Sequence, residues 1–273
     1  MKQTAGQPAG RTAPPPAPAA PAGGDRVLWW RLASVALFCG AWEVAGQIPI
    51  NYAFPPFSHT LAAFFAMVAD GSMGRAYLST LQPLLLGVAI SALLGVGLGV
   101  VMGLRRDVEW LAAPVFIVLQ AAPVAALIPL ITFIYGIGLT AKVLAVCIMA
   151  LPVVVLNSYK AVRNVNPSLV AMCRSFQGTR LQVVLKVVVP DASPVIFAGL
   201  RLGVAAGFIG VVLAELLITP TGIGDLITYH RAVADYAEMY ATIASIILFS
   251  ALTLGLLQRL EVAVFRPERK AAA

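Results

Sequence analysis

The sequence predicts an all-α, polytopic membrane protein with six transmembrane helices and both termini in the cytoplasm. Of its 273 residues, 60% are hydrophobic and only 11% are charged, and the mean hydropathy is +0.88. A soluble domain of this size carries about 25% charged residues, so this chain has too few charges to cover a water-facing surface. Its apolar residues also form several runs of about 20, the length that crosses a bilayer as a helix.

Six apolar runs give the predicted spans, and short polar segments separate them. A shorter helix over 59–69, with Ser58 as its N-cap, is expected to lie between the first two spans. We expect a disordered Ala/Pro-rich tail over 1–25, a membrane domain over 26–265 and a cytoplasmic tail over 266–273. The predicted spans are 27–48, 78–104, 111–135, 143–156, 195–218 and 240–260.

The distribution of positive charge orients these spans. Six spans place both termini on one side, and all but Arg75, Lys142 and Arg231 of the 19 Lys and Arg residues fall on that side. Cytoplasmic loops carry an excess of Lys and Arg, so the termini and the loop over 157–192 are predicted to be cytoplasmic. The net charge of +7 is thereby explained by membrane topology rather than by nucleic-acid binding. The expected location is the bacterial inner membrane.

Small residues and prolines predict how the spans pack. Glycines that recur every four residues form a stripe on one helix face, where two backbones can approach closely. Prolines interrupt the third span, which we therefore expect to be kinked and inside the bundle. The glycines are Gly95, Gly99 and Gly103 in the second span and Gly199, Gly203 and Gly207 in the fifth; the prolines are Pro114, Pro123 and Pro129.

The sequence lacks the motifs of an enzyme. It contains no GxxxxGK[ST], HExxH or GxSxG pattern, and its three cysteines, Cys39, Cys147 and Cys173, have no CxxC spacing. We expect no metal site and no cofactor in this chain, and a surface role for His59 and His230. Ion-coupled carriers usually keep ionisable residues at mid-membrane. Here only Glu43 and Glu215 come near that depth, and both lie towards the outer ends of their spans. Energy for any transport would therefore come from another protein.

The loop over 157–192 resembles the cytoplasmic loop of ABC importer permeases, with Glu-Ala-Ala, three residues, Gly, nine residues and Ile-x-Leu-Pro. Ala171-Met172-Cys173 stands at the Glu-Ala-Ala positions, Gln177 at the Gly position with Gly178 beside it, and Val187-x-Val189-Pro190 at the end. Over 27–265 the chain resembles the nitrate/sulfonate/taurine permease group. The other matching pieces are Pro55-Pro56-Phe57-Ser58, Pro123-x-x-Ala126-x-x-Pro129-Leu130, Tyr135-Gly136-Ile137-Gly138, Pro190-x-x-x-Pro194-x-Ile196-x-x-Gly199-Leu200-Arg201, Ala214-Glu215-Leu216 and Gly222-Ile223-Gly224.

This resemblance implies a machine with several partners. Two permease subunits, identical or different, would pair with a cytoplasmic ABC ATPase dimer that binds ATP and Mg, and a periplasmic or lipid-anchored binding protein would deliver the solute. The loop would form a coupling helix that docks on the ATPase. Its expected residues are Leu169, Ala171, Met172, Cys173, Arg174, Phe176, Gln177, Gly178 and Pro190.

The residues of the loop support that role independently. Leu169, Met172 and Phe176 recur at helical spacing and would form an apolar anchor row; the alternative is a helix that packs against its own bundle. Ser168 is a possible cap for this helix. Two residues depart from the family pattern and change what we expect of the loop. Ala171 lacks the family carboxylate, and Gln177 implies either a different turn or a transfer of the glycine's role to Gly178.

The third and fifth spans are the expected walls of the translocation path. Gln120, Pro123, Pro129, Thr132 and Tyr135 are candidate path residues, and Glu215 is placed near an outer gate. Hydrogen bonding between helices is the alternative for the polar residues among them. The spans carry no clear Arg or Lys to hold an anion, so specificity is expected to lie with the binding protein.

The cargo stays open at this stage. A small anion such as a sulfonate, taurine or nitrate is the favoured expectation from the resemblance. The alternatives are the same machinery for a pyrimidine vitamin precursor or an aromatic acid, a standalone carrier or channel, and a membrane scaffold.

Overall fold

The computed structural model describes residues 24–48, 53–218 and 220–265, and within them all regular secondary structure is helical. Of the tail predicted over 1–25, residues 1–23 lie outside the described residues, as does the tail over 266–273. A helix already begins at Gly24, two residues inside the predicted tail. The helices are α1 (Gly24–Gln47), α2 (Phe57–Ala69), α3 (Ser72–Leu104), α4 (Arg106–Ala121), α5 (Val124–Tyr135), α6 (Leu139–Arg163), α7 (Pro167–Ser175), α8 (Arg180–Val183), η1 (Val184–Val188), α9 (Val189–Leu217), α10 (Ile223–Ala232) and α11 (Tyr236–Phe265).

Four helical segments in the described residues are long and apolar enough to cross a membrane: α3, α6, the continuous segment from α8 to α9, and α11. The pair α4–α5 makes a fifth when it is taken as one broken span. These five match the predicted second to sixth spans. The helix α1 lies where the first span was predicted but is not among them, so the count of six spans stays a prediction.

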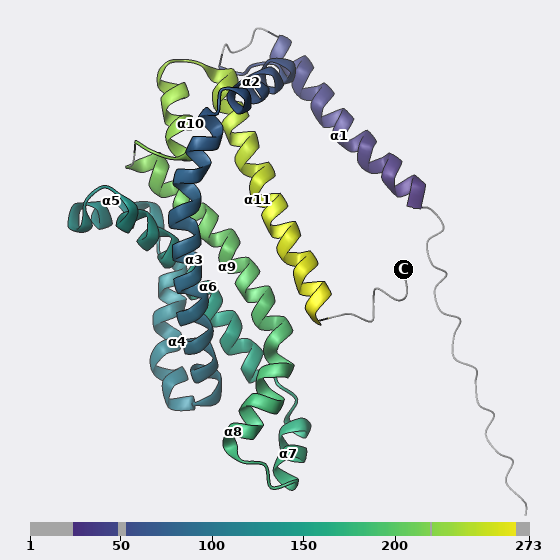
Figure 1. The fold of residues 1–273 in the computed structure, drawn as a ribbon, viewed down its shortest axis with the longest axis vertical. Coiled ribbons are helices and arrows are strands. Elements are labelled where there is room, and N and C mark those ends of the chain that lie inside the picture. The colour runs from purple at the N-terminus through teal and green to yellow at the C-terminus, as the bar shows by residue number, and fades with distance from the viewer. Residues whose placement is uncertain (1–23, 49–52, 219, 266–273) are drawn as a thin grey trace, which may run out of the picture.

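Helices α3, α6 and α9 form the centre of the molecule, with α6 packed along both of the others (Figure 1). Glycines on α3 and α9 face α6 at very short range. A Cβ atom added at Gly99 would lie 2.5 Å from Ser158 Cβ, and one added at Gly203 would lie 2.4 Å from Val154 Cγ2. Because the glycines contribute no side chain at these points, the α6 side chains pack directly on the backbones of α3 and α9, as the glycine stripes predict.

The helix α1 stands apart from this centre and joins it at one end (Figure 1). An aromatic cluster around Trp42 makes the joint, and Trp42 Nε1 also donates to Pro55 O over 3.1 Å. The rings that contact Trp42 are those of Phe38, Phe54, Phe57 and Tyr240. Aromatic pairs of this kind add specific attraction to the area they bury, so the cluster ties α1 to α2 and α11.

The short helix α2 begins two residues earlier than predicted, and Ser58 is not its cap. The N-cap position is Pro56, whose side chain cannot form a hydrogen bond with the helix end. Ser58 instead donates its N–H and its hydroxyl to Glu43 of α1, over 2.8 and 3.0 Å. After α2, the N–H of Ser72 donates to Asp70 Oδ1 over 2.7 Å, and this bond lowers the pKa of the Asp70 carboxyl.

The predicted third span is broken rather than kinked. Helices α4 and α5 meet at an angle of 99°, at Ala122 and Pro123. Proline disfavours a helical conformation in the residue before it, and Ala122 is extended, with φ −65° and ψ 137°. The expectation that this span lies inside the bundle is wrong for α4, which has no buried residue. Helix α5 buries Val124 and Ile128 against α6 and α9.

The predicted loop over 157–192 is largely helical. Its first residues complete α6, and after α7 the chain is continuously helical from Arg180 to Leu217. Pro190 and Pro194 lie inside this segment. The wide turn η1 directly precedes Pro190, with Val189 N donating to Val184 O five residues earlier. Such a turn loosens the backbone before a proline that cannot donate.

Candidate functional site

Helices α7 and α8 form one end of the molecule, beyond the ends of α3 and α6 (Figure 1). Asn166 caps α7 by accepting from Ser168 N over 2.9 Å, and Pro167 occupies the first helical position. The cap is therefore Asn166 and not Ser168, because proline has no N–H and its fixed φ suits the first helical position. The cap fixes where α7 starts and so which of its residues point outward.

The predicted apolar row is largely exposed at this end. Met172 and Phe176 are 54% and 81% exposed, whereas Leu169 is half-buried. Cys173, on another side of α7, packs on the cluster formed by α6, α8 and α9. Ala171 and Arg174 are exposed. One side of α7 thus packs on its own bundle, as the alternative interpretation held, while two large apolar side chains remain free for a partner.

The turn after α7 accommodates Gln177 at the position where the family pattern has glycine. Gln177 adopts the left-handed conformation, with φ 57°, that glycine normally provides at a helix end. Gly178 has a different role: its N–H donates to Cys173 O over 3.0 Å, and a Cβ there would lie 2.7 Å from Cys173 Sγ. The turn is therefore kept, and Gly178 supplies close approach.

The path candidates on α4 and α5 lie on the outside of this chain. Gln120, Pro123, Pro129 and Tyr135 are exposed. The hydroxyl of Thr132 donates to Ile128 O over 2.8 Å and so is used within α5 itself. These residues belong to one broken span. In the single chain, each of them has a side that no other helix covers.

Glu215 lies apart from that group, in a buried polar network that α9 shares with α3 and α6. Its carboxylate accepts from Lys142 Nζ over 2.8 Å, from Thr80 Oγ1 over 2.9 Å and from Gly224 N over 3.0 Å. Lys142 Nζ also donates to Thr221 O over 2.8 Å and to Thr221 Oγ1 over 3.1 Å. Lys142 and Glu215 are 4% and 2% exposed. The network joins α3, α6 and α9 to the segment before α10.

Sequence reasoning assigned Lys142 to the outer side and Glu215 to the outer end of its span, but it missed their pairing. The two residues are 73 positions apart. The available signal was that opposite charges stand at the same predicted membrane end of two spans. Gly222 leaves room for this pair, because φ there is 103° and an added Cβ would collide with the Glu215 carboxylate.

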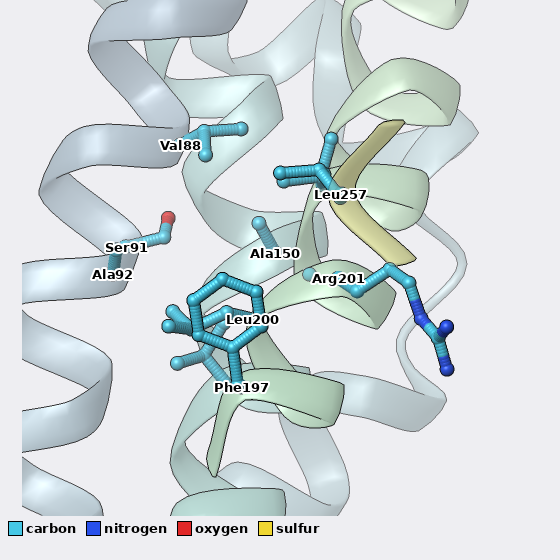
Figure 2. Close-up of a pocket in the computed structure, with 11 residues that line it drawn as sticks. Val88, Ser91, Ala92, Ala150, Phe197, Leu200, Arg201 and Leu257 are labelled. Carbon is cyan, nitrogen blue, oxygen red and sulfur yellow. The ribbon is translucent and has the colours of Figure 1, made fainter. Parts of the chain in front are cut away.

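A small cavity of about 200 Å³ lies among α3, α6, α9 and α11 (Figure 2). Phe197, Leu200 and Leu257 line it, and Ser91 brings a hydroxyl to its wall. The guanidinium of Arg201 points away from the cavity, and it lies 3.5 Å from Glu261. The apolar lining does not suit a charged solute, so we do not place the translocation path here.

One group of side chains in the described residues has the composition of a cation site. Potential ligand atoms of His230, Asp235 and Glu238 lie within 4.8 Å of one another. His230 is thus less solvated than predicted, and its Nδ1 is 3.9 Å from Asp235 Oδ2. The nitrogen-to-oxygen separation is longer than a shared small cation would leave between its ligands.

The helical fold, the apolar spans and the protruding helix between them define a membrane permease. Residues 95–266 match the family described as "Binding-protein-dependent transport system inner membrane component", and the chain belongs to this family. It is therefore an inner-membrane subunit of an ABC transporter and not an enzyme.

Relatives and solved structures agree with that assignment. The riboflavin transport system permease protein RibX of Chloroflexus aurantiacus is 35% identical over 58% of this chain and 60% of the relative. The taurine permease TauC of Escherichia coli is 26% identical over 73% of this chain and 70% of the relative. An inward-facing MetNI methionine ABC transporter shares the fold, with a TM-score of 0.62 at 18% identity, over 70% of this chain and 95% of that one.

Proposed function

We propose that this chain forms one half of the translocation path of an ABC importer, with six spans and cytoplasmic termini. Two permease subunits, identical or different, would enclose the path, and a cytoplasmic ATPase dimer that binds ATP and Mg would drive it. A periplasmic or lipid-anchored binding protein would deliver the solute. The exposed pair Met172 and Phe176 on α7 carries this proposal, because large apolar side chains at the tip of a cytoplasmic helix suit a protein groove.

The docking geometry follows from α7. Its inner side is anchored by Cys173 and by the tight turn at Gln177 and Gly178, so a push on the exposed tip is transmitted to the bundle. From α8 the chain continues without interruption into the segment that ends at Leu217. Movement of α7 would thus be coupled directly to the fifth span, whose outer end holds Glu215.

The test is co-purification from gently solubilised membranes with Met172→Asp and Phe176→Asp. The unmodified chain should retain a P-loop ATPase. Each variant should lose it by about tenfold or more, because a carboxylate in an apolar groove is desolvated without a partner. Ser168→Asp is the matched control, since Ser168 is already polar and exposed one helical turn before Met172, and an acidic residue is favourable in a first helical turn.

The ATPase content should be read by mass spectrometry, and helix content by circular dichroism. Equal retention in both variants and the control would refute the assignment of α7 as the coupling helix. Recovery of the unmodified chain alone would favour a standalone carrier. The same preparation shows whether the second permease is identical or different.

For the cargo, we propose a small anion such as a sulfonate, taurine or nitrate, in line with relatives that are named for taurine, aliphatic sulfonates and nitrate. An aromatic vitamin is the second candidate. The riboflavin relative supports it, and the path candidates Gln120, Thr132 and Tyr135 are uncharged. Uptake of labelled taurine and riboflavin by cells that carry the whole system separates the two.

A further inference from the structure

A basic pocket lies where two helix breaks of this chain meet. The break between α3 and α4 and the turn between α7 and α8 enclose a cavity of about 470 Å³. Three arginines from different elements line it: Arg105 between α3 and α4, Arg174 in the last turn of α7, and Arg180 at the start of α8. Leu104, Gly178, Val183 and Val184 complete the lining.

The three arginines have no acidic partner in the described residues. The ion pairs found there involve Lys142, Arg163, Arg201 and His230. Arginine stays charged at any physiological pH, so three guanidinium groups around one cavity repel one another unless an anion lies between them. Planar guanidinium groups suit phosphate oxygens in particular, because their donors match the oxygens in pairs.

The helices around this pocket place it at a membrane boundary. Helix α3 and the segment from α8 to α9 frame it, and both are candidate spans. Helix α3, at 33 residues, is about 50 Å long. That is longer than the roughly 30 Å hydrocarbon core, so its end at Leu104 reaches the headgroup layer. Next to the pocket, Leu181 and Leu185 are 67% and 58% exposed. The site therefore offers cations for a headgroup and apolar surface for an acyl chain.

We propose that this pocket binds the phosphate of an anionic phospholipid in the cytoplasmic leaflet. The headgroup phosphate would lie among Arg105, Arg174 and Arg180, with the acyl chains along Leu181 and Leu185. Bound there, the lipid would bridge α3 to the α7–α8 turn. The naming of the leaflet rests on the proposed orientation, whereas lipid binding itself does not depend on transport or on the ATPase.

The test uses the assembled transporter in nanodiscs of phosphatidylcholine, with phosphatidylglycerol added as the probe and bound lipid read by native mass spectrometry. Phosphatidylglycerol should be retained over phosphatidylcholine. The double variant Arg105→Gln/Arg180→Gln should bind it about thirtyfold less tightly, since each basic residue near a charged lipid surface contributes about fivefold in affinity. Arg106→Gln is the matched control, because Arg106 is adjacent and exposed but does not line the pocket.

Three outcomes overturn the proposal. The first is equal retention of both lipids, or of phosphatidylglycerol by the double variant and the unmodified chain. The second is displacement of the lipid by millimolar inorganic phosphate, which would assign the pocket to free phosphate. The third is lipid bound by the chain alone but absent once the ATPase is attached, which would assign the arginines to that interface. ATPase retention by the double variant, scored in parallel, keeps failure here distinct from failure of the coupling helix.

Discussion

At the scale of single residues, the pair Lys142–Glu215 shows how this chain keeps two charges in its interior. Removing ions from water costs several kcal/mol each unless geometry and further hydrogen bonds compensate. Here the Lys142 ammonium has three acceptors, and the Glu215 carboxylate has donors from Thr80, Lys142 and Gly224. Because these partners come from separate helices, the pair fixes α3, α6 and α9 relative to one another at one end of the bundle.

We therefore predict that Glu215→Gln destabilises the protein by about 3 kcal/mol or more, because it leaves the Lys142 ammonium buried without a countercharge. The measurement is thermal unfolding in detergent, followed by loss of helix signal. Glu261→Gln is the matched control. Its partner Arg201 is 3.5 Å away and the pair is partly exposed, so the loss should be about 1 kcal/mol or less.

A second variant guards against a general effect of substitution at this site. In Lys142→Met/Glu215→Gln no charge remains buried, so much of the lost stability should return. Equal melting temperatures for Glu215→Gln and Glu261→Gln would show that the buried pair contributes no more than a surface pair.

At the scale of elements, the glycine stripes were visible in the sequence but their partner was not. A spacing of four residues marks a face that allows close approach, yet it does not say which helix approaches. The structure shows that both stripes face α6. Its small or β-branched residues, Val154 and Ser158 among them, fit against the bare backbone. The fourth span was predicted as the shortest, and it is the one that packs along both neighbours.

Two glycines on α3 provide a matched pair for testing this packing. Gly99→Ala should destabilise the protein by about 1–3 kcal/mol, since the new Cβ would lie 2.6 Å from the backbone oxygen of Val155, which cannot move aside easily. Gly97→Ala should be neutral or slightly stabilising, because no atom lies within 4 Å of a Cβ there. Thermal unfolding of the two variants side by side decides, and equal losses would argue against close packing on α6.

The sequence predicted where helices lie better than how they bend. Apolar runs located five of the candidate spans, because hydropathy depends on local composition alone. Pro123 signalled a kink, but the 99° angle depends on what α5 meets on α6 and α9, which local sequence does not contain. Pro190 also lies inside one continuous helical segment, where the wide turn η1 accommodates it. The sequence pattern did not predict this turn.

At the scale of the whole molecule, much apolar surface remains uncovered. Trp110, Leu111 and Phe133 on α4 and α5 are strongly exposed, as is most of α1. In a membrane such side chains face lipid or a second subunit, and both alternatives leave the same sequence signature. The sequence could therefore name residues that are expected to line a path. Whether these residues share a cavity depends on the second permease of the proposed assembly.

The six-span topology is the last prediction, and it turns on whether α1 crosses the membrane. In a chain whose native cysteines are replaced, we expect Ala5→Cys and Ser175→Cys to react with an impermeant maleimide only in inverted vesicles. His59→Cys and Ile137→Cys should react only in right-side-out vesicles, because they lie at the opposite ends of the predicted spans. If Ala5→Cys reacts from the same side as His59→Cys, α1 does not cross and the chain has five spans. If Ser175→Cys reacts in right-side-out vesicles, the orientation is reversed, and α7 cannot meet a cytoplasmic ATPase.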